Sequence, residues 1–283
     1  MKIEIIPIYE KLEEYVAELE KGKQDAETLW EQYAIAPYWQ TLCQYALMDL
    51  SERKPVPIKD SAVLKSQLDL LHNIELDQLQ TEFEKIASLL PNYDDDTITV
   101  ALYPITDENT TVKERQNGVV GTALFGNLII QINPLCADFE KWIPYVFTHE
   151  YHHTVWGNYW FVLHGGALNN RFIDSLLIDG EADSFALSLY PKLRPAWLFD
   201  MSKKTEKRLW NDIYSKLVLK TDVDYCHYMF GEENETIPWC AGYTIGYRIV
   251  QSYLTSHKES SFHELVEKRP EEILNESGYF SVV

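Results

Sequence analysis

The sequence predicts an α+β protein in which helices come first, a small β-sheet follows, and further helices complete the chain. Two observations predict this order. Apolar residues recur with a helical period over residues 8–90, whereas β-branched residues and turn signals dominate residues 97–134. From about residue 138 onward the helical period returns. At 283 residues the chain can bury a substantial core, so its stability does not require a metal.

Residues 1–92 are predicted to form a helical N-terminal region, and residues 93–283 a second domain. Within 12–19, and again within 79–90, apolar residues follow the i, i+3, i+4, i+7 spacing of a buried helix face. The segment SERKPVPIKDS at 51–61 contains two prolines and is predicted to be a loop or linker.

A small sheet is predicted in the chain before the helices that start near residue 138. TITVALYP at 97–104 is a β-branched run typical of a strand. The stretch 117–134 has turn signals at Asn117-Gly118 and Gly126-Asn127 beside two short apolar runs, which indicates a hairpin. Helices are expected at about 138–157, 169–190, 204–219 and 238–256, with a last helical piece starting near Ser260.

The composition excludes some classes of partner. A formal net charge of −19 repels phosphate backbones and anionic lipid surfaces, so neither nucleic acid nor a membrane is an expected partner. Glu4 and Pro7 interrupt what would have to be the apolar core of a signal peptide, and no apolar run approaches bilayer length. We therefore expect a cytoplasmic protein. The oligomeric state is left open.

The four cysteines are widely scattered. They form no C-x-x-C pair, so neither a thiolate zinc site nor a disulfide framework is predicted. We expect buried or idle thiols at Cys43, Cys136, Cys226 and Cys240.

The stretch FTHEYHHTV at 147–155 places three histidines and a glutamate in five consecutive positions. On a helix, with His149 at zero, Glu150 lies at about 100° and His153 at about 40°, so the three share one arc. Two imidazoles one turn apart can hold a single Zn²⁺, and the glutamate can reach a water molecule beside it, as in the H-E-x-x-H arrangement. Glu150 is the predicted general base, which takes a proton from that water.

The alternative for this stretch is an exposed polar turn of a helix. The apolar flanks WIPYVFT and TVW favour a helix buried on most sides, where histidines without partners would be costly. His152 lies off the arc, at about −60°, so we expect it to pack or to support a ligand rather than bind metal.

A catalytic zinc needs three protein ligands and one open position. The downstream candidates lie in LLIDGEADSFALSLYP at 176–191, where Asp179 and Glu181 both follow His153 by about one helix-loop-helix length. Two residues apart on a helix, they point about 200° apart and cannot both face the same ion. One of the two is therefore predicted to be the third ligand.

Three segments together resemble a known family. HEYHH, then DGEADSFA, then PWCAGYTIGYRIVQSYL at 238–254 are similar to the YjaZ-like bacterial family of predicted zinc-dependent proteases, a domain-of-unknown-function family of gluzincin type. The resemblance covers about residues 97–256. It implies a zincin-like metallopeptidase fold, mainly helical with a small sheet before the H-E-x-x-H helix, a Zn²⁺ cofactor, and a peptide or protein substrate.

The resemblance also favours one third ligand. The family's second helix carries E-G-x-A, and Gly180 and Ala182 match its glycine and alanine, so the ligand glutamate falls on Asp179. Aspartate is one methylene shorter, which requires a closer approach of that helix. Glu181 has the family's side chain in the wrong register, on an arc that looks like core. Asp183, one turn after Asp179, is expected either to orient a histidine ligand or to be a surface carboxylate.

Amide hydrolysis also needs a donor for the developing oxyanion. The stretch AGYTIGYRIV has glycines at 242 and 246, four apart on a predicted helix, which allows close packing against a neighbour. The resemblance implies that this stretch belongs to the active region, with Tyr243 as oxyanion donor and Tyr247 or His227 behind it. The alternative is that these tyrosines only pack.

Taken together, the residues predict a zinc-dependent hydrolase, and in particular a metallopeptidase. We expect its substrate to pair with a sheet edge beside the zinc helix, and GNLIIQINP at 126–134 is the predicted edge. The alternative function, which the aspartate at 179 keeps open, is a catalytically inactive zincin-like protein for binding or regulation.

Overall fold

The sheet of this protein has four strands in the order β1-β2-β4-β3. The strands are β1 (Lys2–Pro7), β2 (Thr97–Pro104), β3 (Val119–Leu124) and β4 (Asn127–Ile132). β2 is parallel to both of its neighbours, whereas β3 and β4 form an antiparallel hairpin. The strand at 97–104 and the hairpin within 117–134 are confirmed. β1 was not predicted, since it lies in the region expected to be helical.

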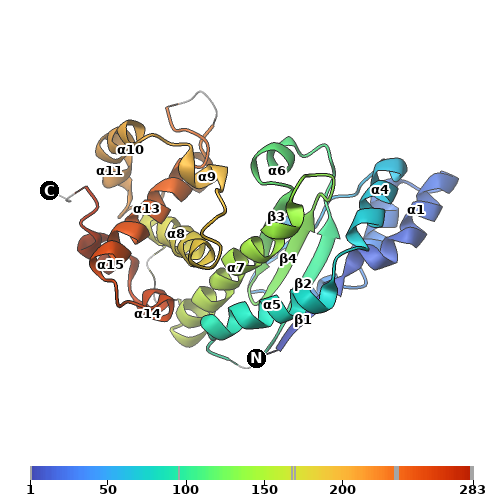
Figure 1. The fold of residues 1–283 in the computed structure, drawn as a ribbon, viewed down its shortest axis with the longest axis horizontal. Helices are drawn as coiled ribbons and strands as arrows, with labels where there is room; N and C mark the ends of the chain where they lie inside the picture. Colours follow the sequence, from blue (N-terminus) through green and yellow to red (C-terminus); the bar gives the residue numbers. More distant parts are fainter. Residues whose placement is uncertain (1, 95, 167, 169, 233–235, 281–283) are drawn as a thin grey trace. The chain divides into compact units, whose positions relative to one another are not determined.

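These facts come from a computed structural model, which describes all residues except 1, 95, 167, 169, 233–235 and 281–283. Internal contacts divide the chain into two units, residues 1–154 and 155–283. The predicted α+β class is confirmed: one group of helices lies between β1 and β2 in the chain, and a second group follows β4 (Figure 1). The functional division expected at residues 92 and 93 stays a prediction.

The hairpin is fixed by its turn and by one buried asparagine. Phe125 and Gly126 form the two-residue turn, and both have positive φ, as a tight hairpin turn of this length requires. The Asn127 side chain accepts the Thr99 N–H at 2.8 Å and donates to the carbonyls of Thr41 and Leu42 at 3.0 and 3.1 Å. Asn127 therefore ties the hairpin to β2 and to the N-terminal region.

The two faces of the sheet meet different partners. Successive residues of a strand point to opposite faces. Gly121 of β3 lies against Glu150, which belongs to the long helix α7 (Phe139–Gly157). Thr122 therefore points to the other face. On that face Tyr103 of β2 donates its hydroxyl to the carbonyl of Ala34, in the N-terminal region.

The helices of the first unit are mostly short. Residues 51–60 form one 3₁₀ turn and then an irregular stretch, so the loop predicted at 51–61 is confirmed up to Ser61, where a helix begins. The helices and turns that precede α7 are η1 (Ile8–Lys11), α1 (Leu12–Lys21), α2 (Ala26–Trp30), η2 (Glu31–Ile35), α3 (Trp39–Leu42), η3 (Ser51–Arg53), α4 (Ser61–Leu71), α5 (Leu76–Leu89) and α6 (Thr110–Arg115).

The second unit is built on the crossing of α8 (Phe172–Leu189) and α13 (Ala241–Ser256). A Cβ atom on Gly180 would lie 2.3 Å from the carbonyl carbon of Gly246, so only glycines let the two backbones come this close. The close approach predicted for Gly246 is therefore confirmed. Around this pair lie η4 (Asn158–Leu163), α9 (Ala196–Phe199), α10 (Lys203–Leu209), η5 (Trp210–Tyr214), α11 (Ser215–Leu217), α12 (Tyr225–Phe230), α14 (Phe262–Glu267) and α15 (Pro270–Ser277).

The helices predicted after the sheet are confirmed, with one interruption. The stretch expected at 204–219 is split by the π-helical turn η5 between α10 and α11. A large buried cluster of this unit includes Leu176 and Leu177 of α8 together with Ile245 and Ile249 of α13. Burial of these side chains on both helices stabilises the crossing.

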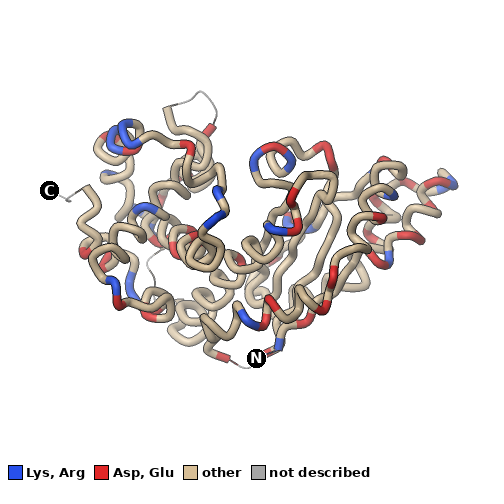
Figure 2. Tube along the Cα trace, in the orientation of Figure 1, with Lys and Arg blue, Asp and Glu red and all other residues tan. Residues whose placement is uncertain are grey.

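Charge is distributed unevenly over the elements. β2, β3 and β4 contain no charged residue, whereas the helices and loops carry both acidic and basic residues (Figure 2). All four cysteines are free thiols, as predicted. Within the part of the chain that is described, no helix combines the length and the apolar character needed to cross a bilayer.

Candidate metal centre

Helix α7 is held by aromatic side chains on the face opposite its histidines. Phe147 stacks on Phe83 of α5 with ring centroids 3.7 Å apart, and Tyr151 donates its hydroxyl to the carbonyl of Leu90 at 2.8 Å. Phe147 and Tyr151 each lie about 160° around the helix from His149. Anchoring of this face fixes the rotation of α7, and the histidine arc therefore points away from α5.

The predicted arc is present in the structure. His149, Glu150 and His153 each offer one ligand atom, and these atoms all lie within 4.8 Å of one another. The Nε2 atoms of the two histidines are 3.0 Å apart, and their ring planes are nearly perpendicular at 88°. All three side chains are half-buried. The two imidazoles thus aim the same nitrogen at one point.

This geometry fits a tetrahedral zinc ion. Two nitrogens that each lie about 2.0–2.1 Å from one ion at a tetrahedral angle are about 3.3 Å apart. The observed separation of 3.0 Å is close to that value. Imidazole nitrogens are also ligands that Zn²⁺ prefers. The donor set of His149 and His153 therefore fits the ion that the sequence implies.

Glu150 is positioned by the neighbouring strand. A Cβ atom on Gly121 would lie 2.2 Å from Glu150 Cγ and 2.8 Å from its Cδ and Oε1. The glutamate side chain therefore occupies the space that any larger residue at position 121 would need. The φ of Gly121 is not positive, so this glycine is required for space rather than for backbone conformation.

His152 is fully buried and is not part of the cluster. Its ring lies 6.4 Å from that of His153, at an angle of 75°. The structure agrees with the expected packing or supporting role.

Three of the buried carboxylates of helix α8 lie close together in the chain, between residues 179 and 183. Asp179 is 4% exposed, and Glu181 and Asp183 are 0% exposed. Burial raises the pKa of Glu181 well above its ordinary value. Asp183 accepts from the indole N–H of Trp197 at 3.2 and 3.3 Å. Asp183 is therefore not the surface carboxylate that the sequence left open.

The tyrosines of α13 face these carboxylates. Burial raises the pKa of Tyr243 well above its ordinary value, and the negative charge of Asp179 adds to the shift. The pKa of Tyr247 is raised by burial and then by Asp183. Both phenols therefore keep their protons near neutral pH and can donate hydrogen bonds. His227, on α12, is exposed.

The predicted site residues thus fall into two groups. His149, Glu150 and His153 belong to the first unit, where the structure brings them together. Asp179, Glu181 and Tyr243 belong to the second unit, where Asp179 and Tyr243 interact electrostatically. The choice of the third ligand and the role of Tyr243 stay predictions.

The predicted sheet edge was wrong. The segment 126–134 forms β4, which lies between β2 and β3 and is paired on both sides. The edge strand beside Glu150 is β3, because it ends the strand order and carries Gly121. The error concerned the order of the two hairpin strands, which the sequence pattern does not determine.

The fold and the cluster define a class: an α+β protein whose helix after a small sheet carries a histidine-glutamate-histidine cluster that could hold a metal ion. Comparison with known families assigns it further. The chain belongs to the family described as "Predicted Zn-dependent protease (DUF2268)", whose family model matches residues 77–275. The resemblance found in the sequence is thereby confirmed.

Relatives add little about activity. The chain is 28% identical over 166 residues to "Uncharacterized protein YjfC" of Bacillus subtilis (strain 168). That match covers 55% of this chain and 54% of the relative, so it spans about half the length of each. No solved structure matches the chain significantly.

Two residues near the candidate site were not identified from the sequence. Gly121 could have been found, since a glycine inside a predicted strand indicates a bulge or a close backbone approach. Arg53 donates to the carbonyl of Ala123 on β3, 70 residues away in the chain. No local signal predicts a contact of that separation.

Proposed function

We propose that this protein is a zinc-dependent hydrolase, and in particular a metallopeptidase that cleaves peptide bonds with Glu150 as general base. The observation that carries the proposal is the cluster on α7, in which two histidine Nε2 atoms lie 3.0 Å apart beside a glutamate. Membership of a family described as predicted zinc-dependent proteases supports the same activity.

His149 and His153 would hold the zinc ion, together with a carboxylate from α8. Zinc supplies Lewis-acid chemistry at such a site, polarising a carbonyl and lowering the pKa of water to about 7. Asp179 is the favoured third ligand and Glu181 the alternative. The register of Asp179 directly before Gly180, as in the family's E-G-x-A pattern, supports this choice.

Glu150 is suited to proton transfer by its position. Its carboxylate lies beside the histidine nitrogens and is confined on one side by the backbone of β3 at Gly121. A carboxylate held there can take a proton from the attacking water and pass it to the leaving amine. Tyr243, which keeps its proton, can donate to the oxyanion that develops on the carbonyl.

The edge of β3 offers a place for the substrate backbone. A peptide can add to an exposed sheet edge through main-chain hydrogen bonds. β3 ends the described sheet and carries Gly121 next to Glu150, so a peptide paired there would pass close to the general base. This pairing replaces the one expected along 126–134.

The test is the variant Glu150→Gln, which keeps the shape of the side chain and removes its basicity. We expect zinc content to be unchanged and kcat for peptide hydrolysis to fall by roughly 10²–10⁴-fold. Zinc is measured by elemental analysis and hydrolysis with a mixed peptide library read by mass spectrometry.

Glu140→Gln serves as the control, because Glu140 is an exposed glutamate of the same helix. Undiminished hydrolysis by Glu150→Gln would refute Glu150 as base. Wild-type protein that binds no zinc and cleaves nothing would instead favour the binding or regulatory alternative.

A further inference from the structure

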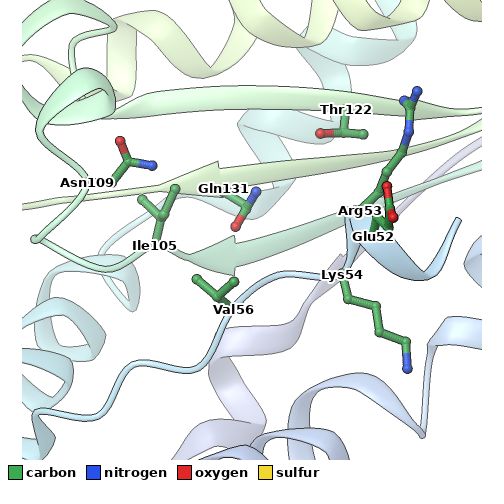
Figure 3. Close-up of a pocket in the computed structure, with 8 residues that line it drawn as sticks. All are labelled: Glu52, Arg53, Lys54, Val56, Ile105, Asn109, Thr122 and Gln131. Atoms are coloured by element: carbon green, nitrogen blue, oxygen red, sulfur yellow. The ribbon is translucent and has the colours of Figure 1, made fainter.

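A cavity of about 400 Å³ opens beside the edge strand, on the face of the sheet away from Glu150 (Figure 3). Thr122 of β3 and Gln131 of β4 form part of its wall. Thr122 follows Gly121 directly, and Gly121 contacts Glu150 from the opposite face. The cavity therefore lies across the sheet from Glu150 and is offset from it by one residue along β3.

Two cations line this cavity, and they differ in what they already bind. Lys54 pairs with Glu31 at 3.0 Å and lies over the ring of Trp39. Arg53 is exposed and donates to the carbonyl of Ala123 at 3.3 Å. Among the residues that the structure describes, no carboxylate lies within ion-pair distance of Arg53. Its charge and most of its five donors therefore remain available to a ligand.

Arg53 stands at the open edge of β3. In an antiparallel pair, alternate residues direct their N–H and C=O groups away from the partner strand. Since Ala123 accepts from Arg53, Ala123 faces the open edge, and so does Gly121 two residues earlier. A peptide that pairs with Gly121 would meet the guanidinium at Ala123, about 7 Å further along.

Successive side chains of such a peptide would point to opposite faces of the sheet. Its side chains would point in turn toward α7 and toward the cavity that carries Arg53 and Thr122. Glu52 lines the same cavity, and its carboxylate would repel an acidic group placed beside it. Of the two cations that line the cavity, Arg53 is the one with no carboxylate at ion-pair distance among the described residues, so a substrate carboxylate would bind Arg53 rather than Lys54.

We propose that Arg53 selects a carboxylate on the peptide substrate, within one or two residues of the bond that is cleaved. This inference rests on the proposed function. Arg53 lies outside residues 77–275, the part that matches the family, so the selection would be a property of this chain rather than of the family match. The carboxylate is that of an acidic side chain or of the peptide's own C-terminus.

Peptide binding to the inactive Glu150→Gln protein tests this directly. Fluorescent peptide pools carry Asp or Asn at one fixed position and mixed residues elsewhere, and a second set compares a free with an amidated C-terminus. In one of the two sets, we expect the peptides that carry the carboxylate to bind about tenfold more tightly than their amide counterparts. A factor of that size corresponds to one charge-assisted hydrogen bond. The set that responds identifies which carboxylate is bound.

Arg53→Gln in the same background should abolish the preference, and Arg53→Glu should reverse it toward pools with Lys at that position. Lys54→Gln is the matched control, since it removes a neighbouring cation that is already paired with Glu31. It should leave the preference intact.

Equal binding of acid and amide pools, a preference that survives Arg53→Gln, or no binding of any pool would overturn the inference. Failure of the proposed function is distinguishable. A wild-type protein that binds acidic pools through Arg53 but hydrolyses none of them would contradict the peptidase activity and leave the Arg53 selection standing.

Discussion

Gly121 contributes to the candidate centre because, having no side chain, it leaves room for the side chain of Glu150. The nearest heavy atom to a Cβ at this position would be Glu150 Cγ, at 2.2 Å. Real Cβ atoms do not approach other carbons so closely, so with any other residue at this position either the Glu150 side chain or β3 would have to move. The position of the proposed general base, Glu150, therefore depends on a residue that has no side chain.

Gly121→Ala is expected to move Glu150 or β3. A displacement of about 1 Å at a reacting group can cost about 10²-fold in rate, and we expect a loss of that order in kcat/KM. Overpacking should also lower the free energy of unfolding by about 1–3 kcal/mol. Peptide hydrolysis and urea unfolding of the same samples measure the two effects. Wild-type values for both would contradict the contact between Gly121 and Glu150.

Local geometry explains which site residues the sequence could predict. His149, Glu150 and His153 are within five positions, and the angle per residue of a helix places them on one arc without further information. The Gly121 contact and the Arg53 contact join distant segments, and they exist only because the hairpin and the N-terminal region reach the same edge. Tertiary packing decides such contacts.

At the scale of elements, the crossing of α8 and α13 positions the carboxylates of α8. Gly180 and Gly246 meet at this crossing, and a Cβ on Gly246 would lie 1.9 Å from the carbonyl oxygen of Leu176. Asp179 precedes Gly180 directly. The separation of the two helices therefore also sets the distance between Asp179 and Tyr243, whose pKa the negative charge of Asp179 helps to raise.

Gly180→Ala is expected to force the two helices apart, because the clash is with backbone atoms of Gly246 that have no rotamer to change. We expect a loss of about 3 kcal/mol in the free energy of unfolding, at the upper end for overpacking. Gly157→Ala is the matched control. It places a Cβ in open space on a helix and should stabilise by up to about 1 kcal/mol.

Urea unfolding of both variants measures the difference. If Gly180→Ala and Gly157→Ala had the same stability, the close crossing of α8 and α13 would be contradicted.

The sequence predicted the elements better than their arrangement. β2, the hairpin and the helix over 139–157 have strong local patterns and were predicted within a few residues. β1 was missed because six residues with a proline at the end give a weak pattern. The order β2-β4-β3 was not predictable, since strand pairing depends on contacts between distant segments.

At the scale of the whole molecule, the residues that match the family model differ in their contents from the residues that precede them. The matched residues 77–275 contain α5, the hairpin, α7, α8 and α13, and so all of the predicted zinc ligands and Tyr243. The preceding residues add β1 to the sheet and supply Arg53 and Lys54 to the cavity. We infer that the matched part carries the chemistry and that the preceding part adjusts what is bound.

The net charge of −19 affects what Arg53 can do, because it opposes the binding of acidic ligands elsewhere on the protein. An acidic protein repels acidic ligands at long range, and only a local cation can reverse that at one position. The expected preference of Arg53 for acidic peptides should therefore depend on salt concentration. The preference for acidic peptides should weaken as ionic strength rises, because Arg53 is exposed and its field is screened.

His149 and His153 are proposed to hold one divalent ion. Crystals of the wild-type protein grown with zinc and measured at the zinc absorption edge test it most directly. We expect a single strong anomalous peak about 2.0–2.1 Å from the Nε2 atoms of both histidines, with a carboxylate oxygen of Asp179 as a further ligand. Density for Glu181 in its place would change only the third ligand. Absence of a peak there, with the Nε2 atoms of the two imidazoles hydrogen-bonded to each other, would contradict metal binding by these histidines.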